Sequence, residues 1–259
     1  MNSVFNGKIL ENSPFENYYV SYAPSDLGNS IGAALYVSHH IHDIPRDDQF
    51  NSSLIGPSYS EEEIEITLKR RKISYSKTDA WQKKVAEILA GGDIVALIEG
   101  KMEFGERALG NRSILADPRK SDMKDKINAM IKYRESYRPF APSALKGSAS
   151  KYFDVPEGFE SHYMEQVVQV RKEMRDIIPA VTHVDGSARL QTVDEQVNEN
   201  LYKIISEFEK LTDVPIVLNT SFNVNGEPIV LSPDDALTTF FNSGLEHLFL
   251  GPYYISKLD

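Results

Sequence analysis

The stretch that decides the fold is IVALIEGKMEFGERALGNRS, residues 94–113. Its five apolar residues at 94–98 predict a short buried strand, and the glycines that follow predict a loop. The spacing of Gly105 and Gly110 resembles that of a P-loop, but a P-loop continues with Lys and then Ser or Thr. Asn and Arg follow in this chain, so we reject a Walker A site.

The loop after this strand is nevertheless a candidate phosphate site. Its backbone N–H groups can form a nest for an anion. Arg107 and Arg112 add guanidinium groups, which suit bidentate contacts with phosphate oxygens. The alternative reading, a glycine turn with surface arginines, stays open at this point.

Helix and strand patterns alternate along the chain. Helices are predicted at 26–37, 60–73, 81–89, 121–131, 192–211 and 232–243. Strands are predicted at 17–20, 94–98, 163–170, 214–218, 248–250 and 253–256. Residues 43–58 have no period and predict a connector. The alternation predicts an α/β fold with a mixed sheet rather than a helical bundle.

Residue pairs with helix-capping chemistry set several of the predicted helix starts. Ser60 and Ser232 each precede acidic residues, which favours an N-terminus. Thr192 and Glu195 have the spacing of a capping box, and Ser121 is the expected N-cap of the helix at 121–131.

The composition excludes several classes of protein. The 259 residues contain no cysteine, so a disulfide scaffold, a thiolate zinc site and a cysteine nucleophile are excluded. The longest apolar runs are short, and the N-terminus lacks a secretory pattern, so we expect a cytoplasmic protein with no membrane partner. A net charge of −10 argues against broad nucleic-acid binding.

The charge is unevenly distributed along the chain. Residues 101–151 hold 12 of the 28 Lys and Arg but only 6 of the 38 Asp and Glu. This basic segment includes Lys132, Arg134 and Arg138, which come close together before a Pro-Phe-Ala-Pro turn. Such clustered cations suit phosphate groups, although basic residues at a helix C-terminus are also common.

Two further stretches carry polar groups suited to phosphate or ribose. LNTSFNVNGEP (residues 218–228) places Ser221 and Asn223 where a predicted strand enters a turn. HVDGSARLQ (residues 183–191) adds Arg189, another cation for an anion site. A plain polar turn remains the alternative for the first stretch, and structural roles are favoured for His183 and its neighbours.

Three long motifs together carry a family resemblance. They are GKMEFGERALGNRSILADPRKSDMKDKINAMIKYRESYRPFAPSAL, HVDGSARLQTV and LNTSFNVNGEPIVLSPDDALTTFFNSGLEHLFLG. They resemble the C-terminal region of the NodU/CmcH-type carbamoyltransferases over most of 59–251. The resemblance implies a YrdC-like twisted mixed sheet with helices over residues 59–259.

The resemblance also implies an activity. It implies O-carbamoyl transfer, in which carbamoyl phosphate and ATP give a carbamoyl-adenylate whose carbamoyl group passes to a hydroxyl of a small-molecule acceptor. By motif match, the implied catalytic residues are Lys132, Arg107 and Arg138. The implied substrate- and nucleotide-binding residues are Arg112, Arg134, Arg189, Ser221 and Asn223. Mg²⁺ is expected with ATP.

Residues 1–58 resemble the end of the preceding domain of this family, which belongs to the actin-like ATPase superfamily. We therefore expect a short remnant of that domain and a connector, with the rest of the first domain acting as a partner in cis or as a separate chain. Asp26 matches a metal-ligand aspartate of that domain. Fe²⁺ or another divalent metal is accordingly expected only in the full-length first domain.

Two other functions remain open from the sequence. A threonylcarbamoyl-adenylate synthase-like enzyme would share the fold and an adenylate product, but it would use threonine and bicarbonate. A non-catalytic nucleotide- or RNA-binding module would use the basic segment alone.

Overall fold

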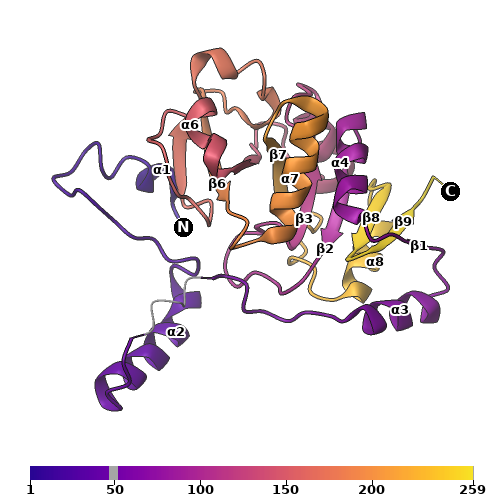
Figure 1. Ribbon diagram of the computed structural model, residues 1–259, viewed down its shortest axis with the longest axis horizontal. Helices are drawn as coiled ribbons and strands as arrows, with labels where there is room; N and C mark the ends of the chain where they lie inside the picture. The colour runs from indigo at the N-terminus through magenta and orange to yellow at the C-terminus, as the bar shows by residue number, and fades with distance from the viewer. Residues whose placement is uncertain (47–51, 259) are drawn as a thin grey trace.

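The computed structural model describes residues 1–46 and 52–258 (Figure 1). Its helices are α1 (Ser3–Asn6), α2 (Asp26–Tyr36), α3 (Glu61–Arg70), α4 (Trp81–Gly91), α5 (Met123–Ile127), α6 (Ala149–Tyr152), α7 (Glu199–Thr212) and α8 (Pro233–Phe241). Single π turns extend α2 at Val37–Ile41 and α5 at Asn128–Lys132, and short 3-10 turns lie at Lys146–Ser148, Lys172–Met174 and Pro179–Val181.

Within the described residues, nine strands form one mixed sheet. They are β1 (Ser76–Lys77), β2 (Val95–Ile98), β3 (Arg112–Ala116), β4 (Ala141–Leu145), β5 (Gln166–Gln169), β6 (Ser187–Val193), β7 (Ile216–Ser221), β8 (His247–Leu250) and β9 (Tyr253–Ser256). Their order is β1-β9-β8-β2-β3-β7-β4-β6-β5. The pairs β2–β8 and β4–β6 are parallel, and the other neighbours are antiparallel. The predicted mixed α/β fold is therefore confirmed.

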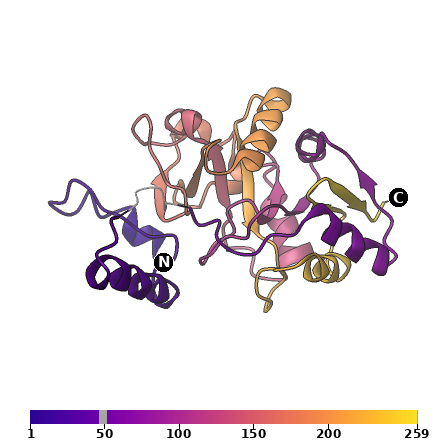
Figure 2. The same ribbon diagram turned by 60° about the horizontal axis from the view of Figure 1, so that its bottom comes forward.

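The helices cover both faces of this sheet. Helices α4 and α7 pack side by side on one face, and α3 and α8 lie on the other (Figure 2). Strand β2 is buried along its whole length, as its apolar run predicts. The main core joins residues from both helix layers and the sheet, so the strand ends are held rigidly where the loops begin.

The N-terminal segment extends away from this core. Helix α1 is anchored at the β5 edge, where Ser3 Oγ donates to the carbonyl of Met164 at 2.9 Å. Helix α2 lies outside the body of the molecule and has no buried residue (Figure 1). Tyr22 and Ala23 lie in a second, smaller core that includes Leu109 and Tyr163. The turn before α2 is thus fixed to the body, and the helix itself contacts this small core through the partly buried Ile31.

Several sequence-based predictions of elements are confirmed. Ser60 and Ser232 are the N-caps of α3 and α8, each within a capping box. Helix α4 ends at Gly91, and Gly92 caps it with a left-handed backbone. The helix at 26–37 and the strands at 94–98, 214–218, 248–250 and 253–256 are present within a few residues. The connector at 43–58 is irregular where it is described, and residues 47–51 lie outside the described residues.

Other predictions are wrong. Thr192 lies inside β6 rather than at a helix start, and Asn198 caps α7 instead. Residues 17–20 are irregular backbone and not a strand. Asp122, not Ser121, precedes α5. The change to a π turn after Ile127 shifts the helical phase and leaves Met130 38% exposed, although sequence periodicity places it on the buried face.

Among the described residues, no helix combines the length and the apolar character needed to cross a bilayer.

Replacing Ser232 by Ala tests the α8 cap. Ser232 Oγ accepts from the Asp235 N–H at 3.2 Å, and the Asp235 carboxylate accepts from the Ser232 N–H at 2.9 Å. We expect Ser232→Ala to lower the free energy of unfolding by about 1 kcal/mol, measured by urea denaturation. Ser76→Ala, at an exposed serine of β1, is the control. An equal loss in both variants would contradict the assigned cap.

Candidate functional site

A pocket of about 320 Å³ opens where β7 ends beside the start of β4. Its lining consists of Glu106, Arg107, Ala108, Lys132, Arg134, Arg138, Pro139, Phe140, Ala141, Met164, Arg189, Asn219, Thr220, Ser221, Asn223, Val224, Asn225 and Gly226. The fold thus brings together seven of the residues predicted for the site, namely Arg107, Lys132, Arg134, Arg138, Arg189, Ser221 and Asn223. Arg112 and Asp26 are not in the lining.

Lys132 connects two of the motifs. Its Nζ donates to the carbonyl of Ser221 at 2.5 Å and to Oδ1 of Asn223 at 2.8 Å. Ser221 Oγ also donates to Asn223 Oδ1 at 2.7 Å. Burial, together with nearby Arg134 and Arg138, lowers the pKa of Lys132 to about 7. A small change in its surroundings therefore changes the charge of this amine.

Two arginines of the 134–138 loop face the same pocket. Arg134 Nε donates to Asn128 Oδ1 at 2.7 Å, and its guanidinium lies 4.7 Å from the centre of the Phe140 ring. Burial and the neighbouring Arg138 lower the pKa of Arg134 to about 10. Arg138 itself is exposed, so it can move toward an incoming anion.

Arg107 and Arg189 contribute donors that lack partners. Both Nε atoms are buried and have no hydrogen-bond partner among the described residues. Burial, Arg107 and Arg134 together lower the pKa of Arg189 to about 10. Glu106 also lines the pocket, and its carboxylate accepts from the Met1 amino group at 2.8 Å. Buried unpaired donors beside like charges favour an anionic ligand.

Three backbone N–H groups at the end of the 103–111 loop are already paired within the protein. The buried carboxylate of Glu103 accepts from the N–H groups of Leu109 at 2.6 Å and Asn111 at 2.7 Å. The N–H of Gly110 donates to Ser113 Oγ at 3.0 Å. These three donors are therefore not available to an anion, whereas Glu106, Arg107 and Ala108 of the same loop line the pocket.

The prediction that Arg112 binds substrate or nucleotide is wrong, because Arg112 lies outside the pocket. Its side chain is completely buried and donates to the carbonyls of Pro57, Leu231, Glu99, Gly100 and Asn111. These hydrogen bonds hold together the connector, the end of strand β2 and the loop before α8. Arg112 is not among the residues that line the pocket.

Asp26 lies in the first turn of α2 and is exposed. Its carboxylate belongs to no cluster of three possible metal ligands in the described part of the chain. One carboxylate does not make a metal site, so the predicted metal at Asp26 requires ligands from outside these residues.

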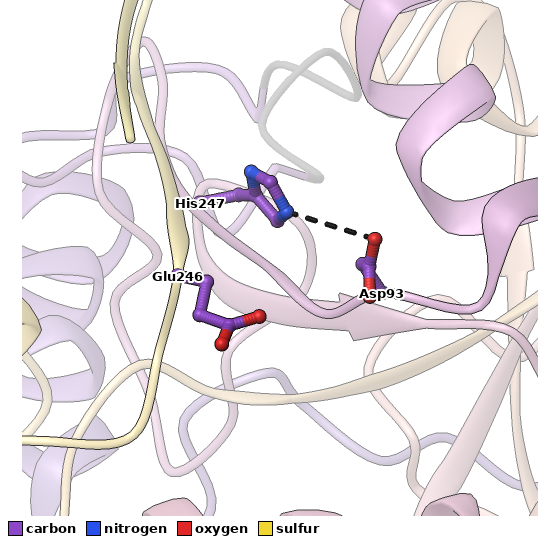
Figure 3. Close-up of side chains that lie close together, drawn as sticks. All are labelled: Asp93, Glu246 and His247. Carbon is purple, nitrogen blue, oxygen red and sulfur yellow. Dashed lines mark ion pairs between the residues drawn. The ribbon is translucent and has the colours of Figure 1, made fainter. Parts of the chain in front are cut away.

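A different group of possible ligands lies at the opposite half of the sheet. Asp93, Glu246 and His247 have ligand atoms within 4.8 Å of one another, where β2 and β8 begin side by side (Figure 3). His247 Nε2 is 3.8 Å from the Asp93 carboxylate, and Nδ1 lies 2.8 Å from the Tyr254 hydroxyl. The contact between His247 and Asp93, which is ionic when the imidazole is protonated, involves two of the three residues, and we assign no ligand to the group.

Sequence reasoning included Asn219 in the polar stretch at 218–228 but did not name it as a site residue. Asn219 is 1% exposed, and its amide lies among Ser143 of β4 and Gln191 of β6. The three residues are far apart in the sequence, and only the pairing of β4 with β6 and β7 brings them together. The sequence did contain one signal. Asn219, Gln191 and Ser143 each lie two residues from a residue that lines the pocket, and residues two apart in a strand lie on the same face of the sheet.

Comparisons with known proteins identify the family to which the chain belongs. Residues 86–257, about two thirds of the chain, match the family model described as "Carbamoyltransferase C-terminus". The chain belongs to this carbamoyltransferase family. The match includes all seven of the predicted site residues that line the pocket, and it confirms the resemblance to NodU/CmcH-type proteins.

Relatives in the carbamoyltransferase family are longer than this chain. Nodulation protein NolO of Bradyrhizobium diazoefficiens is 43% identical over 260 residues, which are 99% of this chain and 47% of NolO. Nodulation protein U of Rhizobium fredii is 35% identical over 227 residues, 87% of this chain and 37% of that protein. The chain therefore spans about half of these relatives or less.

One solved structure is also similar. The crystal structure of full-length HypF in the phosphate- and nucleotide-bound form aligns with a TM-score of 0.43 at 18% identity. The alignment covers 87% of this chain and 28% of HypF.

Separate substitutions of Arg112 and Arg138 test which of the two arginines binds an anion. Arg112→Met leaves several buried carbonyls unpaired, so we expect unfolding free energy to fall by about 3 kcal/mol while the folded protein keeps its affinity for sulfate. Arg138→Ala should show the reverse, with little change in stability and weaker sulfate binding. Urea denaturation and calorimetry measure the two quantities. Loss of sulfate binding in folded Arg112→Met would contradict our placement of this arginine.

The lowered pKa of Lys132 predicts proton uptake on binding. A bound dianion favours the ammonium form, so the pKa rises in the complex and affinity falls as the pH rises above about 7. Sulfate is a suitable probe because it keeps its charge throughout this range. Burial lowers the pKa of His183, which keeps its titration below this range.

Calorimetry of sulfate binding near pH 8, in buffers of different ionisation enthalpy, measures that proton uptake. We expect uptake in the unmodified chain and in Lys120→Ala, a change at an exposed lysine outside the pocket. Lys132→Met should abolish it. Equal uptake in Lys132→Met would show that another group titrates.

Proposed function

We propose that this chain is the carbamoyl-phosphate- and ATP-handling part of an O-carbamoyltransferase. The observation that carries the proposal is the pocket of about 320 Å³ with five cationic side chains, two of which have buried donors without partners among the described residues. Membership of the carbamoyltransferase family supplies the reaction class. A YrdC-like domain with this role is what the sequence motifs imply.

The shape and charge of the pocket favour a small phosphate compound over a nucleic acid. Arg107, Arg134, Arg138 and Arg189 supply guanidinium groups, and Lys132 adds an ammonium. Their charges converge on one concave site, whereas RNA-binding proteins spread cations along an exposed surface. The pocket volume suits a small substrate with part of a nucleotide.

The proposed chemistry uses these cations for charge stabilisation. Water cleaves carbamoyl phosphate into carbamate and inorganic phosphate. A carbamate oxygen then attacks the α-phosphorus of ATP, and pyrophosphate leaves with the electron pair of the broken P–O bond. Arg107 and Arg138 hold phosphate oxygens, and Lys132 stabilises charge on the departing phosphate. Ser221 and Asn223, both in contact with Lys132, orient the nucleotide.

Mg²⁺ would accompany ATP and neutralise charge on its phosphates. The pocket lining contains Glu106 and several amide and hydroxyl groups, but no cluster of carboxylates. These residues fit a metal held chiefly by the polyphosphate and its waters. The protein side chains then contribute orientation rather than a closed metal cage.

The N-terminal segment would contact the first domain of a longer carbamoyltransferase. Helix α2 exposes Leu27, Leu35 and Tyr36, while Ile31 is half-buried. Because NolO is about twice as long as the matched region, its remaining part is the proposed cover for this helix. That part would also provide the acceptor hydroxyl site and the further ligands that Fe²⁺ or another divalent metal needs beside Asp26.

Calorimetry with carbamoyl phosphate, in the presence and absence of ATP, tests the proposed function. We expect binding by the unmodified chain and at least about tenfold weaker binding by Arg107→Met, because charge-assisted hydrogen bonds are lost. Lys120→Ala, which removes an exposed cation of the same basic segment, should bind normally. Absence of binding under both conditions would contradict the proposal.

The alternative enzymatic function differs from the proposed one in its substrates. A threonylcarbamoyl-adenylate synthase-like enzyme would release pyrophosphate from ATP with threonine and bicarbonate. The proposed enzyme would do so with carbamoyl phosphate, and an assay of pyrophosphate release with each substrate set distinguishes the two.

A further inference from the structure

Asn219 presents a buried oxygen atom to a pocket that is otherwise rich in hydrogen-bond donors. Its Oδ1 has no hydrogen-bond partner among the described residues, although the side chain is almost completely buried. An unpaired buried acceptor is costly and uncommon in a folded protein. The position of Asn219 in the pocket lining suggests that a ligand supplies the missing donor.

The orientation of the Asn219 amide is fixed by a chain of hydrogen bonds. The chain starts at the carbonyl of Leu109, which can only accept, and which accepts from Gln191 Nε2 at 2.9 Å. Gln191 Oε1 is therefore an acceptor, and it receives Ser143 Oγ at 2.5 Å and Asn219 Nδ2 at 3.0 Å. Asn219 Nδ2 also donates to Ser143 Oγ at 3.0 Å.

Rotating the Asn219 amide by half a turn would place its oxygen against Gln191 Oε1, which is also an acceptor. It would also place that oxygen beside Ser143 Oγ, whose proton is already donated to Gln191. Both amide hydrogens of Asn219 are used, so the network leaves Oδ1 as a fixed acceptor. The Asn219, Gln191 and Ser143 residues are each less than 5% exposed, so solvent has little access to hydrogen-bond the two facing acceptors.

We propose that Asn219 Oδ1 accepts a hydrogen bond from the amino group of the carbamoyl substrate, and thereby selects carbamoyl phosphate over acyl phosphates that lack this group. This inference rests on the proposed function. The arginines and the ammonium form of Lys132 can donate to phosphate and carbonyl oxygens but cannot accept from an amine. In the carbamoyl phosphate dianion, the amino group is the donor, and a fixed neutral acceptor complements it.

The proposal predicts selectivity between two ligands of nearly equal shape. Acetyl phosphate has a methyl group in place of the amino group, so it leaves Asn219 Oδ1 unpaired when it binds. A site built to pair a ligand N–H rejects the analogue that lacks it. We expect acetyl phosphate to bind at least about tenfold more weakly than carbamoyl phosphate, whereas the shared phosphate contacts remain.

The test compares these ligands by calorimetry on the full 259-residue chain. Phosphonoacetamide and 2-oxopropylphosphonate form a second pair, because they differ in the same amino-for-methyl exchange and resist hydrolysis. Asn219→Leu should bind both members of each pair with similar affinity and bind sulfate as the unmodified chain does. Asn242→Leu, at an exposed asparagine after α8, is the control and should retain the selectivity.

The outcomes separate this proposal from the proposed function. Equal affinity for both members of each pair in the unmodified chain would overturn the role of Asn219, even if Asn219→Leu failed to fold. Selectivity that persists in folded Asn219→Leu would overturn it as well. If the unmodified chain bound neither carbamoyl phosphate nor phosphonoacetamide, the proposed function itself would fail, and this inference with it.

Discussion

The contact between Lys132 and the turn at Ser221 and Asn223 holds the pocket together. Lys132 stands at the end of the helix that follows β3, whereas the turn follows β7, 89 residues further along the chain. The ammonium meets two backbone carbonyls and two side-chain oxygens there. This contact holds the turn after β7 next to the end of the helix that precedes the arginine loop.

Such a site is electrostatically unfavourable by itself. Burial and repulsion among neighbouring cations lower the pKa values of Lys132, Arg134 and Arg189 together. Repulsion among cations is relieved when an anion binds, so part of the cost of assembling the site is recovered as affinity. The extensive core between the two helix layers and the sheet supplies the stability that allows this arrangement.

The sequence predicts best those elements whose signals are local. Ser60 and Ser232 mark helix starts through chemistry within three residues, and both are confirmed. Strands β3, β4 and β6 were missed because their patterns mix polar and apolar residues. Ser143 and Gln191 are buried in β4 and β6 because they pair with Asn219 across the sheet, which no hydrophobic pattern reveals.

Charge counts locate the neighbourhood of the site but do not identify its members. Within the basic segment, Arg119 pairs with Asp117, and Lys146 pairs with Glu160. The guanidinium of Arg112, in the same segment, donates to backbone carbonyls. Arg189 comes from β6, outside the segment, and yet lines the pocket. Arg107 and Arg189 differ from Arg112 in having buried donors without partners among the described residues, and that is decided by strand order and loop packing rather than by local composition.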